Sequence, residues 1–144
     1  MKKYWNYFKY IIEHKKNVFM FCWEEKMYVH AFLHDMSKFS PTEFISYSKN
    51  FYGTPTEKLD SKFDYAWLHH QRKNKHHWEY WVDGNGKALR IPYKYLKQML
   101  CDWKAMGKKF NDTPLSYYNK NKKGFNLERG TRILLEDMLT KRVK

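Results

Sequence analysis

Apolar residues recur every three or four positions along most of this chain, which is the spacing of amphipathic helices. The first such stretch runs from about residue 3 into the mid-twenties, and a shorter one covers residues 27 to 34 or 35. The apolar stripe of the first stretch, on which His14 also falls, consists of Tyr7, Ile11, Val18 and Phe21. The pattern predicts two consecutive helices, with a histidine on the buried face of the first.

A strong helix start follows at Ser40-Pro41-Thr42-Glu43. Ser40 can cap the helix, Pro41 suits its first position, and the Glu43 side chain can reach back to complete a capping box. We expect this helix to stop near Gly53 and residues 54–57 to form a loop.

Further helices are expected at about residues 59–73, 92–106 and 127–141, with a single turn at 114–118. β-branched residues and glycines are few, which favours helix over sheet. The predicted fold is all-α, a compact single-domain bundle of about six helices spanning residues 1–144.

One short β-hairpin fits near residues 80–91. Asp83-Gly84-Asn85-Gly86 is a turn signal, and it can join residues 80–82 to residues 89–91 as two short strands.

The composition is that of a folded domain, with 42% hydrophobic and 19% aromatic residues. A disordered chain would be less apolar. No run of about 18 apolar residues is present, so we expect no membrane-spanning helix. Residues 1–16 lack the continuous apolar segment of a signal peptide. Cys22 and Cys101 stand alone in apolar helical stretches, which predicts buried free thiols in a reducing cytoplasm.

The chain carries 28 basic and 15 acidic residues, for a formal net charge of +13. Such a charge suggests a polyanionic partner, namely nucleic acid, a nucleotide or an anionic membrane surface. A solvated basic surface without a dedicated partner is the alternative.

The first candidate for chemistry is the sequence His34-Asp35-Met36-Ser37-Lys38. Imidazole is a common metal ligand, and a carboxylate offsets part of the charge of a metal ion. Adjacent residues on a helix point about 100° apart, but at a helix end both side chains can reach one ion. The alternative for the dipeptide is a surface or capping aspartate beside a core histidine.

The densest histidine cluster lies within nine residues and consists of His69, His70, His76 and His77. In a continuous helix, one face would carry His70, Asn74 and His77, and the adjacent face His69, Lys73 and His76. Histidines two turns apart are about 10 Å apart along the axis, too far to share one ion in a straight helix. A site here needs a break near Asn74, two neighbouring ions or a bridging phosphate; a basic, partly aromatic surface patch is the alternative.

Asp102 and His14 both fall on apolar helical stripes. A buried carboxylate is costly unless it is paired or metal-bound, so Asp102 is either a ligand or the partner of a lysine or arginine. A lone histidine on such a stripe is more often a satisfied core residue than a ligand. The short loop after its helix, however, brings His14 close to His34.

Taken together, His14, His34-Asp35 and Asp102 resemble the signature of the HD-domain metal-dependent phosphohydrolases. The resemblance implies an all-helical bundle in which these four residues bind a divalent metal. His34-Asp35-x-x-Lys38 is also similar to the extended HDxxK form, which implies that Lys38 contacts the substrate phosphate.

The additional histidines resemble those of two-metal members of this superfamily. This implies that His70 and His77, or alternatively His69 and His76, hold a second ion. More closely, residues 34–40, 69–81 and 99–103 are similar to a small bacterial and phage branch of the superfamily. That similarity implies that the protein resides in the cytoplasm of a bacterium or of a phage-infected host cell.

The resulting hypothesis is metal-dependent hydrolysis of a phosphoester, with a nucleotide, another phosphorylated small molecule or nucleic acid as substrate and no membrane partner. One or two ions of Mn, Fe, Co, Ni, Zn or Mg would be bound by Asp35 and the other ligands. The bound metal would activate a water molecule for the hydrolysis. Charge on the phosphoryl group would be neutralised by Lys38 and Arg72, and the phosphate would also meet Lys73 and Asn74. His70 would bind the second ion or protonate the leaving oxygen.

Two competing hypotheses remain at the level of sequence. One is a non-catalytic module that binds nucleic acid or protein and retains a metal site. The other is metal-dependent redox chemistry, because helical histidine and carboxylate sites can hold iron.

Overall fold

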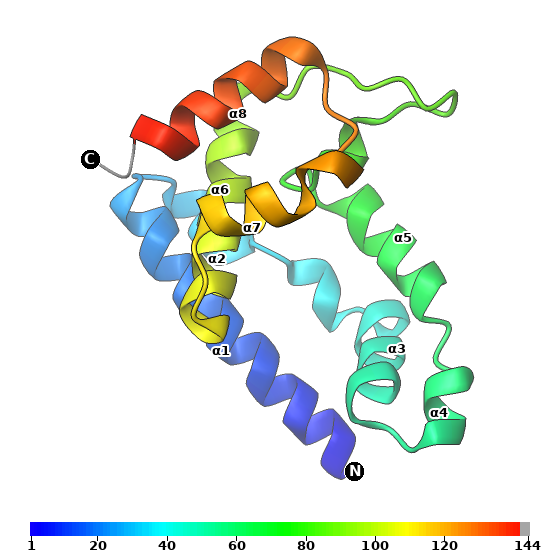
Figure 1. The fold of residues 1–144 in the computed structure, drawn as a ribbon. Coiled ribbons are helices and arrows are strands. Elements are labelled where there is room, and N and C mark those ends of the chain that lie inside the picture. The colour runs from blue at the N-terminus through cyan, green and yellow to red at the C-terminus, as the bar shows by residue number, and fades with distance from the viewer. Residues whose placement is uncertain (142–144) are drawn as a thin grey trace.

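The computed structural model describes residues 1–141, and it is all-α as predicted. Within that range it contains no β-strand, eight α-helices and three short 3₁₀ helices (Figure 1). The elements are α1 (Lys2–Glu24), α2 (Tyr28–Leu33), η1 (Met36–Phe39), α3 (Pro41–Tyr52), α4 (Pro55–Leu59), α5 (Phe63–Lys73), η2 (Trp78–Trp81), α6 (Tyr93–Phe110), α7 (Pro114–Asn121), η3 (Lys122–Gly124) and α8 (Arg129–Lys141).

The long helix α1 packs against three other helices, α2, α3 and α6. On one side, α3 contacts α4 and α5; on the other, α7 contacts α6 and α8 (Figure 1). The short segment from α2 to η1 lies between these two sides, and it carries His34, Asp35 and Lys38.

Helix α3 starts where the local sequence predicts, but its expected capping box is incomplete. The Ser40 hydroxyl accepts the Glu43 N–H at 3.4 Å and Pro41 occupies the first turn of α3, as predicted. The Glu43 side chain does not complete the expected capping box, because it is fully buried and bonds to histidines instead. A capping box forms at Thr54 and Glu57, where it starts α4 in the stretch that was expected to be a loop.

The expected hairpin near residues 80–91 is reduced to one antiparallel bridge between Val82 and Ala88. The turn itself forms, since the Asp83 carboxylate accepts two backbone N–H groups and Gly86 takes a φ of +80°. The first expected strand is replaced by η2, because Trp81 packs on the core formed by α6 and α8 and donates its indole N–H to the Lys75 carbonyl at 2.9 Å.

The hydrophobic interior lies beside the histidines and holds their helices in place. The largest core cluster consists of Ile91, Leu96, Met99, Leu100, Tyr118, Leu135, Met138 and Leu139. Cys22 and Cys101 are both buried, as predicted, and lie in a second cluster between α1 and α6. None of the helices in the described part of the chain has the length and apolar character needed to cross a bilayer.

Candidate metal centre

His34 and Asp35 converge because α2 ends immediately before them. His34 takes an extended ψ of 127°, and Asp35 takes the left-handed conformation at φ 54°. Such a conformation costs a non-glycine residue on the order of 1 kcal/mol, and the packed surroundings must maintain it. The helix end therefore aims both side chains at the same place, which continuous helix would not do.

The first ligand group consists of His14, His34, Asp35 and Asp102, whose donor atoms all lie within 4.8 Å of one another. The Nε2 atom of His14 lies 2.9 Å from Asp102 Oδ1 and 3.3 Å from His34 Nε2. His34 Nε2 is also 3.3 Å from Asp35 Oδ2. Residues from α1, the end of α2 and α6 thus meet at one point, as the sequence had suggested.

A break at Asn74 brings the later histidines back toward that point. Helix α5 ends at Lys73, and Asn74 is extended at φ −122° and ψ 105°. Its side-chain amide donates to the His70 carbonyl and to the Ser37 hydroxyl, each at 2.8 Å. The break near Asn74, one of the three arrangements that would allow a histidine site here, is therefore present, and Asn74 stabilises it.

The second ligand group consists of Asp35, His70, His76 and His77, again with donor atoms within 4.8 Å of one another. His70 Nε2 lies 2.9 Å from His77 Nε2 and 3.4 Å from Asp35 Oδ1, and His76 Nε2 lies 3.2 Å from the same oxygen. Oδ1 of Asp35 therefore faces the second group while its Oδ2 faces the first. This is the geometry of a carboxylate that can bridge two cations.

Two buried atoms at this junction, Asp35 Oδ1 and His76 Nε2, lack hydrogen-bond partners among the described residues and could both bind a cation. Within residues 1–141, neither Asp35 Oδ1 nor His76 Nε2 makes a hydrogen bond, although they lie 3.2 Å apart. Buried polar atoms are rarely left without a partner, because desolvating them costs free energy. A metal ion between them would satisfy both lone pairs, so the residues present fit such an ion.

The electrostatics of the two groups differ. Burial opposes ionisation of Asp35 and Asp102, but neighbouring histidines and Lys38 hold the pKa of Asp35 well below its usual range, and His14 and His34 do the same for the pKa of Asp102. Burial lowers the pKa of His34, yet the charges of Asp35 and Asp102 raise it to about 9. A proton on His34 thus supplies positive charge between the two carboxylates.

Two histidines of the second group, His76 and His77, are held neutral. Burial lowers the pKa of His76, and burial together with His76 and His70 lowers the pKa of His77 further. A neutral imidazole has the free lone pair that a metal requires.

Further polar groups orient the ligands from behind. Glu43, fully buried, contacts the Nδ1 atoms of His69 at 2.7 Å and His70 at 2.8 Å. His30 Nε2 lies 3.1 Å from His34 Nδ1. A carboxylate or ring behind a ligating histidine sets its tautomer and orientation. Sequence reasoning missed both roles: Glu43 looked like a helix cap, and the only signal for His30 was its position four residues before His34.

The remaining predicted site residues separate into those inside the site and those outside it. Lys38 lies 2.6 Å from Asp35 Oδ2 and keeps a raised pKa, because the Asp35 charge outweighs its burial. His69 contacts Glu43 and belongs to neither ligand group. Arg72 and Lys73 are exposed at the end of α5, and neither lines the cavity described next.

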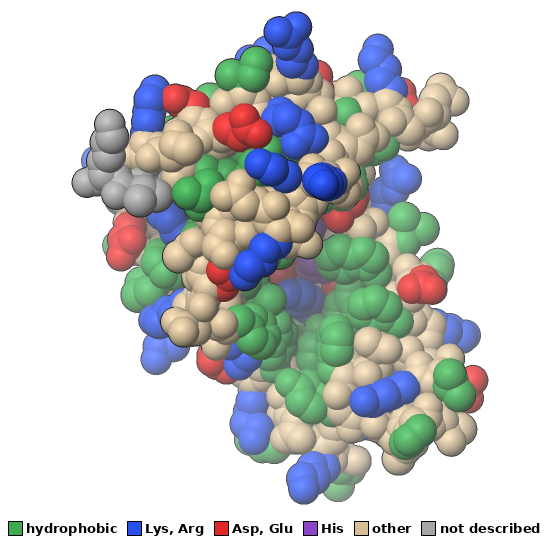
Figure 2. All heavy atoms as spheres, viewed as in Figure 1, with side chains coloured by type: hydrophobic (Ala, Val, Ile, Leu, Met, Phe, Trp, Pro, Cys, Tyr) green, Lys and Arg blue, Asp and Glu red, His purple; other side chains and the backbone are tan. Residues whose placement is uncertain are grey.

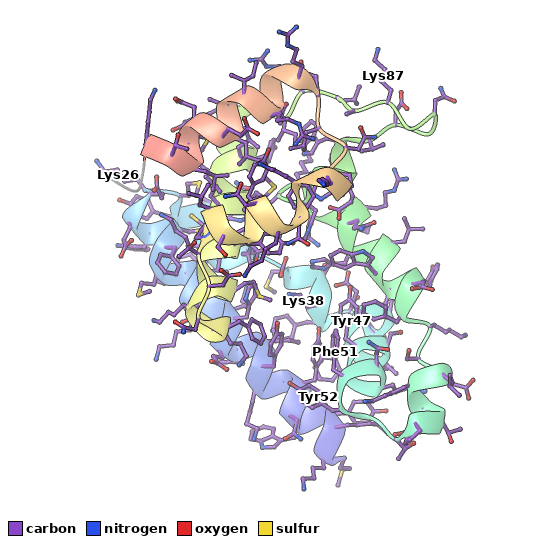
Figure 3. All side chains as sticks on the ribbon, viewed as in Figure 1. Lys26, Lys38, Tyr47, Phe51, Tyr52 and Lys87 are labelled. Atoms are coloured by element: carbon purple, nitrogen blue, oxygen red, sulfur yellow. The ribbon has the colours of Figure 1, made fainter. Side chains whose placement is uncertain are left out.

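Both ligand groups open into one cavity of about 360 Å³. In the space-filling view, histidine and basic side chains are visible inside a hollow framed by hydrophobic ones (Figure 2). Lys38 lies near the centre of the molecule, with Tyr47 and Phe51 of α3 beside it on the side of α5 (Figure 3). The residues of the two candidate ligand groups are thus accessible from solvent through a passage lined by aromatic side chains.

Comparison with known proteins places the chain in a family without assigning it an activity. No curated protein and no solved structure matches it significantly. A model described as "Family of unknown function (DUF5662)" matches residues 3–141. Because this match covers nearly the whole chain, the protein belongs to the DUF5662 family.

Proposed function

We propose that this protein is a metal-dependent phosphohydrolase that holds two divalent ions on either side of Asp35. The observation that carries the proposal is the pair of ligand groups sharing this carboxylate at the floor of an open cavity. Two ions roughly 3.5–4 Å apart are typical of enzymes that hydrolyse phosphate esters. The resemblance of His14, His34-Asp35 and Asp102 to HD-domain enzymes supports the same reaction.

Each ligand group has a distinct role in this proposal. The first ion would be held by His14, His34, Asp35 and Asp102, and the second by Asp35, His70, His76 and His77. Bound ions of this kind lower the pKa of a coordinated water toward neutrality and polarise the phosphoryl group. The many imidazoles favour Mn, Fe, Co, Ni or Zn over Mg, which prefers an all-oxygen environment.

Lys38 would neutralise charge on the phosphoryl oxygens. Its ammonium lines the cavity beside Asp35 and remains charged, since its pKa is raised. A fixed positive charge stabilises a phosphoryl group most in the transition state, when charge spreads over its oxygens. Arg72 and Lys73 carry no part of this proposal because both lie outside the cavity lining.

Metal analysis and turnover together test the function. Protein purified without chelator should carry close to two equivalents of a transition metal, and should hydrolyse at least one member of a panel of phosphomonoesters, phosphodiesters and nucleotides. Chelator should abolish turnover, and added Mn or Co should restore it. Protein that binds no metal at micromolar concentrations contradicts the proposal outright. Metal-loaded protein that binds nucleic acid but turns over nothing supports the non-catalytic alternative.

A further inference from the structure

We infer that the substrate is a phosphate monoester whose organic part is an aromatic or similarly flat, apolar group. The inference rests on the proposed function, and it concerns the part of the cavity that lies away from the ligand groups. That part is lined by aromatic side chains on two sides, while positive charge is confined to its floor.

The first side of the cavity is formed by rings from α3 and α5. Tyr47, Phe51 and Phe63 lie within 6 Å of one another, with ring centroids 5.6 to 5.9 Å apart. The Tyr47 hydroxyl donates to the Ala66 carbonyl at 3.3 Å and the residue is only 3% exposed, so Tyr47 supports Phe51 and Phe63 from behind. Phe51 lines the cavity and is 50% exposed, so part of its ring remains uncovered by the protein.

The second side is formed by α6 and α7. It consists of Met99, Trp103, Met106, Phe110 and Tyr117. Phe110 is 61% exposed. The Met106 sulfur accepts a hydrogen bond from the Tyr10 hydroxyl at 3.7 Å. A flat apolar group placed between the two sides would cover rings that now face solvent, and this burial favours binding.

Charge in the lining argues against a polyphosphate or a nucleic-acid strand. Among the described residues that line the cavity, Lys38 is the single lysine or arginine. The lining carboxyl groups outside the ligand groups are Glu79 and Asp112. Extra phosphates would therefore meet aromatic rings and acids, although the chain as a whole has a net charge of +13. A volume of about 360 Å³ suits one phosphate with one or two rings.

Two phosphates of primary alcohols test this inference, because their leaving groups are similar. With Mn-loaded protein, we expect kcat/KM for 2-naphthylmethyl phosphate to exceed that for glycerol 1-phosphate by about tenfold or more, a ratio typical of apolar pockets. ATP should be the poorest of the three. Equal values for the two monoesters, or a preference for ATP, would overturn the inference.

Variants at the rim identify the surface responsible. Phe51→Ser and Phe110→Ser should each lower the ratio of the two kcat/KM values severalfold, mainly through KM for the naphthylmethyl ester. Tyr65→Ser is the matched control, since Tyr65 is an aromatic residue on α5 that is 64% exposed and outside the lining. A ratio that falls equally in all three variants would contradict the assignment of the two sides.

A binding experiment separates this inference from the proposed function. If no phosphate ester is hydrolysed, the proposed function fails, and the affinity of metal-loaded protein for 2-naphthylmethylphosphonate and methylphosphonate then decides the inference. Calorimetry should give at least tenfold tighter binding of the aromatic phosphonate. Equal affinities would overturn the inference whether or not the protein is an enzyme.

Discussion

The first ligand group contributes two carboxylates and two imidazoles, whereas the second contributes three imidazoles and shares its carboxylate with the first. In the first group the negative charge is large enough to raise the pKa of His34 to about 9. In the second group the pKa values of His76 and His77 fall, so these rings stay neutral. The two carboxylates of the first group therefore need a positive charge nearby to balance them. The second group offers a metal mainly the lone pairs of imidazole rings, with one shared carboxylate as its negative charge.

The groups also differ in how the chain assembles them. The first joins α1, the end of α2 and α6, which are far apart in sequence. The second, apart from Asp35, comes from residues 70–77, which span the end of α5 and the segment that follows it. We expect the first group, with its two carboxylates, to bind its ion more tightly and to release the His34 proton on binding, and the second to depend more on the local break at Asn74.

The largest effect should come from Asp35→Ala, because this carboxylate belongs to both groups. We expect metal content to fall from about two equivalents to none, with helix content by circular dichroism unchanged. Asp64→Ala, at an exposed position on α5, should keep both ions. Retention of one equivalent in the Asp35 variant would show that the groups do not depend on a shared ligand.

Lys38→Ala should affect catalysis without affecting metal binding. Because Lys38 is not a ligand, both ions should remain, whereas kcat should fall roughly 10²- to 10³-fold, as when one charge-stabilising donor is removed. Lys38→Arg should recover part of the loss, and Lys109→Ala, which breaks an exposed pair with Glu13, should have no effect. Loss of metal in Lys38→Ala would mean that Lys38 supports the Asp35 geometry instead.

A direct comparison of Asp102→Ala with His77→Ala tests the order of affinities. We expect His77→Ala to retain one tightly bound ion, and Asp102→Ala to retain one ion that chelator removes at about tenfold to a hundredfold lower concentration. Competition with a fluorescent chelator gives both values. The reverse order would identify the histidine-rich group as the tighter one.

A smaller effect is expected from Glu43→Gln, which keeps the size of the side chain but removes the charge behind His70. Loss of such a supporting carboxylate costs roughly 10- to 100-fold in metal affinity, and we expect about tenfold, confined to the second ion. Glu13→Gln, at an exposed position of α1, is the control. An equal effect on both ions would indicate a general change in packing.

The smallest effect concerns the stability of metal-free protein as a function of pH. Burial and neighbouring histidines lower the pKa of His30 to about 3, and the pKa values of His76 and His77 are lowered too. Below the ordinary histidine pKa of about 6.5, the unfolded chain therefore binds more protons, and stability falls as pH falls. The raised pKa of His34 acts oppositely, since its contribution is lost as pH rises through about 9.

The melting temperature of chelator-treated protein should therefore be highest near pH 6.5 to 7, and should drop by roughly 5 °C at pH 5, a shift typical of one or two kcal/mol. With metal bound, the drop on acidification should be steeper, because protons compete for the ligands. A melting temperature that rises steadily from pH 5 to pH 9 would contradict these shifts.

The sequence by itself predicted most of the helices and the four residues of the first ligand group. The Ser40-Pro41 start and the apolar stripe containing His14 act within one or two turns, where local rules hold. Asp102 could be proposed because a carboxylate on a buried stripe needs a partner. The adjacency of His34 and Asp35 then supplied the remaining pair.

Only the tertiary structure decided which histidines form the second group, and which basic residues do not line the cavity. The directions of His76 and His77 depend on the dihedral angles at Asn74, which contacts with His70 and Ser37 stabilise. The Glu43 side chain was free to cap α3, but packing of α3 against α5 turned it toward His69 and His70. Such choices depend on segments far apart in the chain, and periodicity within one helix carries no information about them.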